Sequence, residues 1–73
     1  MTLLELLKRT YEQQKIDLYN EDCTIVTIEK NRQELINEII TKHEKEFRNI
    51  INSEVTMIDV TDNYILRITI KRG

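Results

Sequence analysis

The sequence contains one histidine and one cysteine, the two residue types that most often act as base or nucleophile near neutral pH. His43 lies within an apolar helical stripe, with no Ser, Cys or Asp arranged to make it a catalytic base. We favour packing at a core edge or a dimer seam over a pH-sensitive or ligand-contacting role. Cys23 follows Glu21 and Asp22, whose charge opposes a thiolate, so we expect a small buried residue there.

Composition excludes several kinds of site. Gly73 is the single glycine and proline is absent, so a glycine-rich phosphate loop is excluded. One cysteine and one histidine cannot complete a zinc cluster without other ligands, and no calcium-loop spacing occurs. We therefore expect no enzyme activity, no catalytic residues, no metal and no cofactor.

Acidic side chains cluster in the first half of the chain, where Asp17, Glu21 and Asp22 are candidate partner-binding residues. A solvated acidic edge is the favoured interpretation. The alternative is a surface that attracts a basic partner, since clustered charge steers association.

The elements that must position these residues follow from periodicity and turn signals. Thr2 and Glu5 predict a capped helix from residue 3 to about 15, or nearly to 19. Residues 23–28 predict a strand, and an alternative pairs that strand with residues 16–19 as a short hairpin. Asn31 and Glu34 predict the start of a long amphipathic helix over residues 32–52.

Residues 55–60 and 64–71 predict a C-terminal β-hairpin. A loop over residues 61–63 pairs Val60 with Tyr64 and Ile58 with Leu66, because the other register would bury Asp59. Asn63 suits a left-handed loop position. The outer hairpin face supplies the remaining candidate partner-binding residues, Val55, Met57, Ile65, Arg67 and Lys71. The final strand is a possible free sheet edge. Alternatively, the first helix or residues before 28 cover this face.

The predicted fold is a compact single α+β domain spanning residues 1–73, in the order α-β-α-β-β. A long amphipathic helix packs on a small, mostly antiparallel sheet that ends in the hairpin. A chain of 73 residues buries a small core, so homodimerisation is expected to add stability. The predicted core is Leu4, Leu7, Tyr11, Ile28, Ile36, Ile39, Ile40, Phe47, Ile50, Ile58, Leu66 and Ile68.

Two families share parts of this pattern. Residues 1–7 followed by residues 24–32, a helix and a terminal hairpin resemble MinE, the topological factor of division-site placement. That resemblance implies membrane binding by residues 1–7 and contact with a partner ATPase by residues 24–32. The chain lacks that family's usual spacer before the long helix. Residues 64–72 are similar to the last strand of Alba-type nucleic-acid-binding proteins, without their leading strand or basic balance.

Size and charge favour a small cytoplasmic binding module that modulates a partner protein as an inhibitor or adaptor, of phage or other mobile-element origin. The net charge of −2 disfavours nucleic acid, although Arg67, Lys71 and Arg72 could contact phosphates. A nucleic-acid-binding regulator is therefore the runner-up hypothesis, and a MinE-like cell-division regulator is a further alternative. No membrane span is expected, because no apolar run is long enough.

Overall fold

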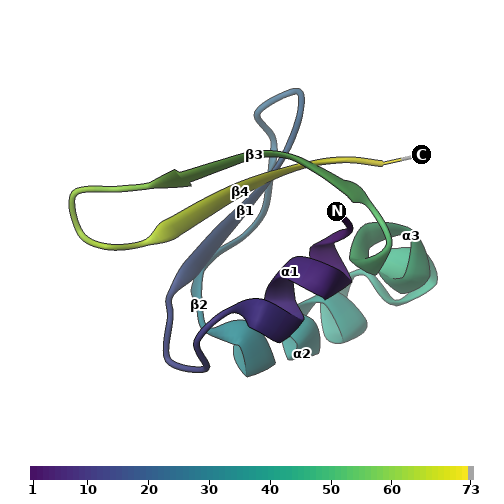
Figure 1. Cartoon of the computed structure of the whole chain (residues 1–73). Helices are drawn as coiled ribbons and strands as arrows, with labels where there is room; N and C mark the ends of the chain where they lie inside the picture. The colour runs from purple at the N-terminus through teal and green to yellow at the C-terminus, as the bar shows by residue number, and fades with distance from the viewer. Residues whose placement is uncertain (73) are drawn as a thin grey trace.

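A computed structural model describes residues 1–72 (Figure 1). The elements, in chain order, are α1 (Leu3–Arg9), β1 (Ile16–Asn20), β2 (Ile25–Lys30), α2 (Arg32–Lys42), the 3-10 helix η1 (Glu44–Glu46), α3 (Phe47–Ile51), β3 (Glu54–Val60) and β4 (Leu66–Lys71). They form a compact single domain of the α+β class, as predicted.

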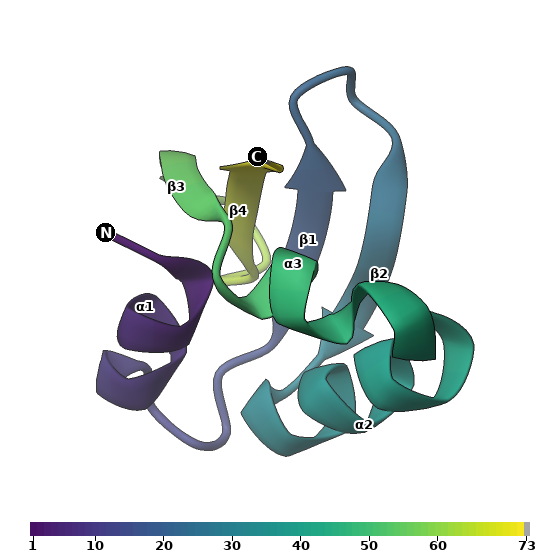
Figure 2. The same ribbon diagram turned by 90° about the vertical axis from the view of Figure 1, so that its right-hand side faces the viewer.

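The strands form a four-stranded mixed sheet in the order β2-β1-β4-β3. Both hairpins are antiparallel, and β1 and β4 join them as a central parallel pair. All the α-helices lie on the same side of the sheet, with α1 beneath the β3–β4 hairpin and α2 beneath β2 (Figures 1 and 2). Within residues 1–72, the other side carries no helix.

Helix α1 begins where the sequence predicts and ends much earlier. Thr2 and Glu5 form the expected capping box, which satisfies backbone amides at the helix start. At the other end, Thr10 adopts extended backbone angles and its hydroxyl donates to the Leu6 carbonyl at 2.7 Å. The predicted extension to residue 15 or beyond is therefore wrong, and Tyr11, expected in the core, is exposed.

Residues 16–20 form a strand rather than the end of a helix, so the predicted order α-β-α-β-β is wrong. Ile16 and Leu18 are fully buried and alternate with half-buried Asp17 and Tyr19, which is the two-residue period of a strand. Strand β1 pairs with β2, which was the alternative considered for this segment. The gain of β1 places a parallel strand pair at the centre of the sheet.

The predicted long helix over residues 32–52 is divided at His43. Asn31 and Glu34 form the expected capping box at the start of α2. The amide of His43 still donates to the Ile39 carbonyl, but its backbone angles, φ −132° and ψ 40°, leave the helical region. The chain turns through η1 before α3 begins, and this change of direction brings Ile50 and Ile51 into the core.

The C-terminal hairpin is confirmed, but its register is displaced by two residues. Val60 pairs with Leu66 and Ile58 with Ile68, so the loop spans residues 61–65. The Thr61 amide donates to the Ile65 carbonyl at 2.9 Å and closes this longer loop. The left-handed residue is Tyr64, with φ 61°, and Asn63 is not in that conformation. From Met57 to Val60, a shift of two residues keeps the β3 side chains on their predicted faces.

The core lies between the sheet and the helices. Its buried apolar residues are Leu3, Leu7, Ile16, Leu18, Val26, Leu35, Ile39, Ile50, Ile51, Ile68 and Ile70. Of the predicted core, Leu7, Ile39, Ile50 and Ile68 are buried, and Leu4, Ile36, Phe47 and Leu66 pack at its boundary. Ile28, Ile40 and Ile58 are exposed, contrary to expectation.

Candidate protein-binding surface

The helix-free side of the sheet is the candidate functional site, and we call it the outer face. Ile16, Leu18, Ile68 and Ile70 are buried toward the helices, so their neighbours along each strand point the opposite way. Cross-strand pairing adds Ile25, opposite Tyr19. The outer face comprises Asp17, Tyr19, Ile25, Met57, Asp59, Arg67, Thr69 and Lys71.

A shallow hollow of about 380 Å³ lies on this face, where β1, β3 and β4 meet the turn after β1. Its walls are formed by Tyr19, Asn20, Glu21, Cys23, Met57, Arg67 and Thr69. Met57, one of the wall residues, is 62% exposed, and Ile25, which pairs with the wall residue Tyr19, is 58% exposed. Such a combination of apolar groups and concavity is typical of a surface that contacts another molecule.

An ion pair crosses the outer face between β3 and β4. The Arg67 guanidinium donates to Asp59 at 2.8 Å, and the Val60 amide donates to the same carboxylate at 2.9 Å. The hydrogen bond from Arg67 is the main cause that lowers the pKa of Asp59, followed by the bond from Val60. In turn, Asp59 raises the pKa of Arg67. The charge of Arg67 is therefore largely balanced within its own sheet.

The acidic turn between β1 and β2 borders one end of the hollow. The Thr24 hydroxyl and amide donate to Asp22 at 2.6 and 3.0 Å, and these bonds lower the pKa of that carboxyl. Cys23 adopts φ 69° and is exposed, so the expectation of a buried cysteine is wrong. The turn geometry places its side chain at the wall of the hollow instead.

The structure places most of the predicted site residues together. Asp17, Met57, Arg67 and Lys71 lie on the outer face. Glu21 and Asp22 adjoin it, and both line a second hollow with Lys71 and Arg72.

Two predicted members of the outer face lie elsewhere. Val55 pairs with Ile70 and packs against the core, because the bulge between Val55 and Met57 turns its side chain toward the helices. Ile65 belongs to the loop before β4 and is half-buried.

Sequence reasoning placed Thr69 on the outer face of the hairpin but missed Tyr19 and Ile25 as members of the surface. The missing signal was the pairing of residues 16–19 with the following strand, which was considered only as an alternative. Once that pairing is accepted, Tyr19 and Ile25 share a face with Thr69, because Tyr19 pairs with both. The final strand was also expected as a sheet edge, but β4 lies between β1 and β3.

Two of the three basic residues proposed for nucleic-acid contact, Arg67 and Arg72, are engaged within the domain, whereas Lys71 is exposed. Arg67 pairs with Asp59, as described above. Arg72 donates to the Asn20 side chain at 3.1 Å and pairs with Glu46. These contacts reduce the positive charge available to a phosphate backbone and weaken the support for that hypothesis.

The apolar side chains of the N-terminal helix pack in the core of the domain. Leu3 and Leu7 are almost completely buried, so α1 does not present the apolar face that an interfacial membrane helix needs. None of the helices within residues 1–72 combines the length and apolar character needed to cross a membrane.

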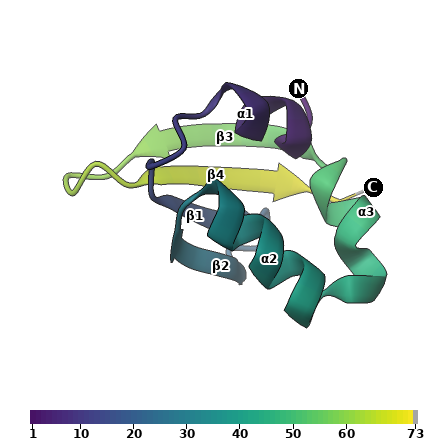
Figure 3. The ribbon, with the colours of Figure 1, turned by 90° about the horizontal axis from the view of Figure 1, so that it is seen from below.

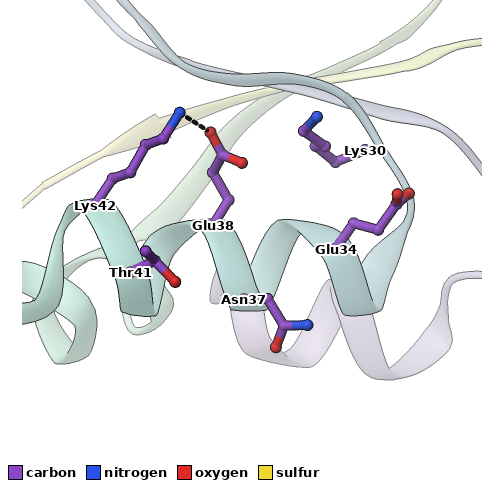
Figure 4. Close-up of a pocket in the computed structure, with 6 residues that line it drawn as sticks. All are labelled: Lys30, Glu34, Asn37, Glu38, Thr41 and Lys42. Carbon is purple, nitrogen blue, oxygen red and sulfur yellow. Dashed lines mark ion pairs between the residues drawn. The ribbon is translucent and has the colours of Figure 1, made fainter.

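A separate hollow of about 310 Å³ lies along α2 near the end of β2. Its lining residues are Lys30, Glu34, Asn37, Glu38, Thr41 and Lys42 (Figure 4). Lys42 and Glu38 point toward each other and form an ion pair at 2.8 Å, which lowers the pKa of Glu38. This hollow is an exposed, charged helix surface with an internally balanced pair, which suits solvent contact better than ligand binding.

Within the described part of the chain, no three His, Cys, Asp or Glu side chains converge to hold a metal ion. No protein-family model, curated protein or solved structure matches this chain. The geometry of the outer face is therefore the basis for a functional proposal.

Proposed function

We propose that this chain is a small non-enzymatic module that binds and modulates a partner protein, as an inhibitor or adaptor, through the outer face of its sheet. The observation that carries the proposal is the concave, partly apolar hollow on a sheet surface that no helix covers. A surface of this kind exposes Met57 and Ile25 to water unless another molecule removes them from it.

The charge around the hollow indicates the chemistry of the partner. Glu21 and Asp22 form an acidic border, whereas Arg67 is balanced by Asp59. The complementary partner surface would insert an apolar side chain near Met57 and place a basic group opposite the acidic turn. Complementary charge of this kind mainly increases the rate and specificity of association.

The same proposal places the protein in the cytoplasm. Exposed Cys23 supports this location, because a reducing compartment keeps such a thiol unpaired.

Site-specific photocrosslinking tests the proposed surface. A photoreactive residue at Thr69, on the outer face, should capture a partner protein in cells. The same residue at Asn37, on the exposed side of α2, is the positional control. Capture from Thr69 should be competed by excess unmodified protein.

Two further substitutions define which outcome supports the proposal. Ile25→Lys should abolish capture from Thr69, because it places a charge on the apolar border. Ile40→Lys should leave capture intact, because Ile40 is on α2 and that helix lies on the side of the sheet opposite the outer face. Capture from Asn37 alone, or capture that persists in Ile25→Lys, would contradict the proposed surface. The activity of the captured protein should change with the unmodified chain and not with Ile25→Lys.

A further inference from the structure

Strand β3 forms one of the two edges of the sheet, and its first residues are already covered. The Leu3 amide donates to the Ser53 carbonyl at 2.9 Å, and the Val55 amide donates to the Met1 carbonyl at 2.9 Å. Thr2 and Glu54 form an antiparallel bridge between these two bonds. The N-terminal residues thus close the edge as far as Val55 and leave residues 56–60 open.

The hydrogen-bond pattern shows which backbone groups face the open edge. The Thr61 amide donates to Ile65 across the hairpin, so alternate residues along β3 direct their polar groups toward β4. The intervening residues, Ile58 and Val60, direct theirs outward. The Val60 amide donates to the Asp59 side chain at 2.9 Å. The alternation of the ladder directs both main-chain groups of Ile58 away from β4.

The side chains around this edge are apolar on both sides of the sheet. Ile58 is 49% exposed and Val60 is 58% exposed on the helix side, and Met57 is exposed on the outer face. The end of the β3–β4 hairpin extends beyond α1 (Figures 1 and 3). A free edge bordered by apolar side chains on both sides is a template for another strand.

Strand edges are usually protected by lysine, proline or irregular pairing. The open part of β3 contains neither lysine nor proline, and its single charged residue, Asp59, is paired with Arg67. The pairing of β3 with β4 has one register shift, between Val55 and Met57, and is regular from Met57 to Val60. The opposite edge, β2, is more irregular, because its pairing with β1 has two register shifts and Glu29 adopts φ 54°. Of the two edges, β3 is therefore the one prepared to accept a strand.

We propose that residues 56–60 pair with the same residues of a second copy of this chain, antiparallel and centred on Ile58. In this register the two Ile58 residues exchange main-chain hydrogen bonds and their side chains meet. Met57 of each copy stands opposite Asp59 of the other, so no two like charges are directly opposed. The segment also has the β-branched and apolar composition that the incoming strand needs.

Such pairing joins the two sheets edge to edge and leaves both outer faces open. The dimer would present one wider outer face. Because the pairing uses the β3 edge and not the outer face, a dimer and a partner bound to the outer face are compatible. It also removes from water the apolar side chains that the small core leaves exposed.

Light scattering over a range of micromolar concentrations tests the proposal. The unmodified protein should have the mass of a dimer. Ile58→Lys should be monomeric, because it places two positive charges opposite each other at the centre of the interface. Ile40→Lys is the matched control, since Ile40 is 47% exposed on α2 and its substitution should leave the dimer intact. Circular dichroism should show the same fold for all three proteins.

A covalent test applies even if Ile58→Lys fails to fold. Opposed hydrogen-bonded residues in antiparallel strands have Cα atoms about 5.5 Å apart, a distance that a disulfide can span. Ile58→Cys in a Cys23→Ser background should therefore oxidise to a covalent dimer, and Ile40→Cys in that background should not. A monomeric mass for the unmodified protein would overturn the proposal and leave the edge for a strand from a different protein. A dimer that persists in folded Ile58→Lys would also overturn it.

Discussion

Ile58 and Ile68 are opposite each other across β3 and β4, yet Ile68 is fully buried and Ile58 is 49% exposed. Both side chains point to the helix side of the sheet, so a difference in face does not explain the difference in exposure. The difference arises because Ile68 is on the interior strand β4, whereas Ile58 is on the edge strand β3. The hairpin formed by these strands extends past α1 (Figure 3). The domain thus leaves apolar surface at one edge and on its outer face, and these are the two surfaces that we propose for contact with other molecules.

Thr27 places an unsatisfied hydroxyl in the core, and a single substitution that removes this hydroxyl should stabilise the fold. The residue is buried and its hydroxyl has no hydrogen-bond partner within residues 1–72. Valine has nearly the same shape without the hydroxyl, so Thr27→Val should raise the free energy of unfolding by about 1 kcal/mol. Thr24→Val is the control and should lower it, because the Thr24 hydroxyl donates to Asp22. Urea denaturation measures both, and a loss of stability in Thr27→Val would contradict the assignment.

Arg32 connects the end of α1 to the start of α2. Its guanidinium donates to the carbonyls of Leu7 and Thr10 at 3.4 and 3.2 Å and to Glu12 at 3.4 Å. We expect Arg32→Ala to lower the free energy of unfolding by about 1–2 kcal/mol, because it removes the side-chain donor to the Thr10 carbonyl and one of the two donors to the Leu7 carbonyl. Arg48→Ala, at an exposed position on α3, should have a much smaller effect on the same denaturation curve. Equal effects of the two substitutions would exclude a capping role for Arg32.

The Asp59–Arg67 pair predicts a specific dependence of stability on pH. The pKa of Asp59 in the folded chain is below its ordinary value of 3.8. A carboxyl with a depressed folded pKa stabilises the native state above its ordinary pKa, and this contribution is lost as the pH falls through the folded value. The stability difference between the unmodified protein and Asp59→Asn should therefore be present near neutral pH and shrink below pH 3.8.

Two measurements check this pH dependence. Urea midpoints across the acidic range give the stability difference, and an NMR titration should place the midpoint of Asp59 below 3.8. Asp62→Asn, in the adjoining exposed loop, is the matched control and should leave the pH dependence of the unmodified protein unchanged. A stability difference for Asp59→Asn that stays constant through the acidic range would show that the ion pair does not cause it.

Local signals in the sequence were sufficient for the helix starts, because each is a short-range capping box, at Thr2 and at Asn31. The hairpin followed from the alternation of its strands. Where α1 ends and where the long helix divides at His43 could not be predicted, since the apolar stripe continues through both points. Tertiary packing decides them: Ile16 and Leu18 are buried as a strand, and Ile50 and Ile51 reach the core only after the chain turns.

The candidate site was also predicted only in part, because local patterns reveal some of its residues and tertiary pairing determines the others. Met57 and Arg67 followed from the hairpin pattern, and Asp17, Glu21 and Asp22 from charge. Tyr19 and Thr69 become neighbours only through the parallel pairing of β1 with β4. That contact joins distant parts of the chain and has no local sequence signal.

Chemical-shift mapping with the partner captured through Thr69 tests the central claim most directly. Addition of that partner to isotope-labelled protein should shift the amide signals of Tyr19, Ile25, Met57 and Thr69 on the outer face. Signals from Asn37 and Thr41, on the exposed side of α2, should remain unchanged. Shifts confined to α2, with the outer face unaffected, would contradict a function carried by the open side of the sheet.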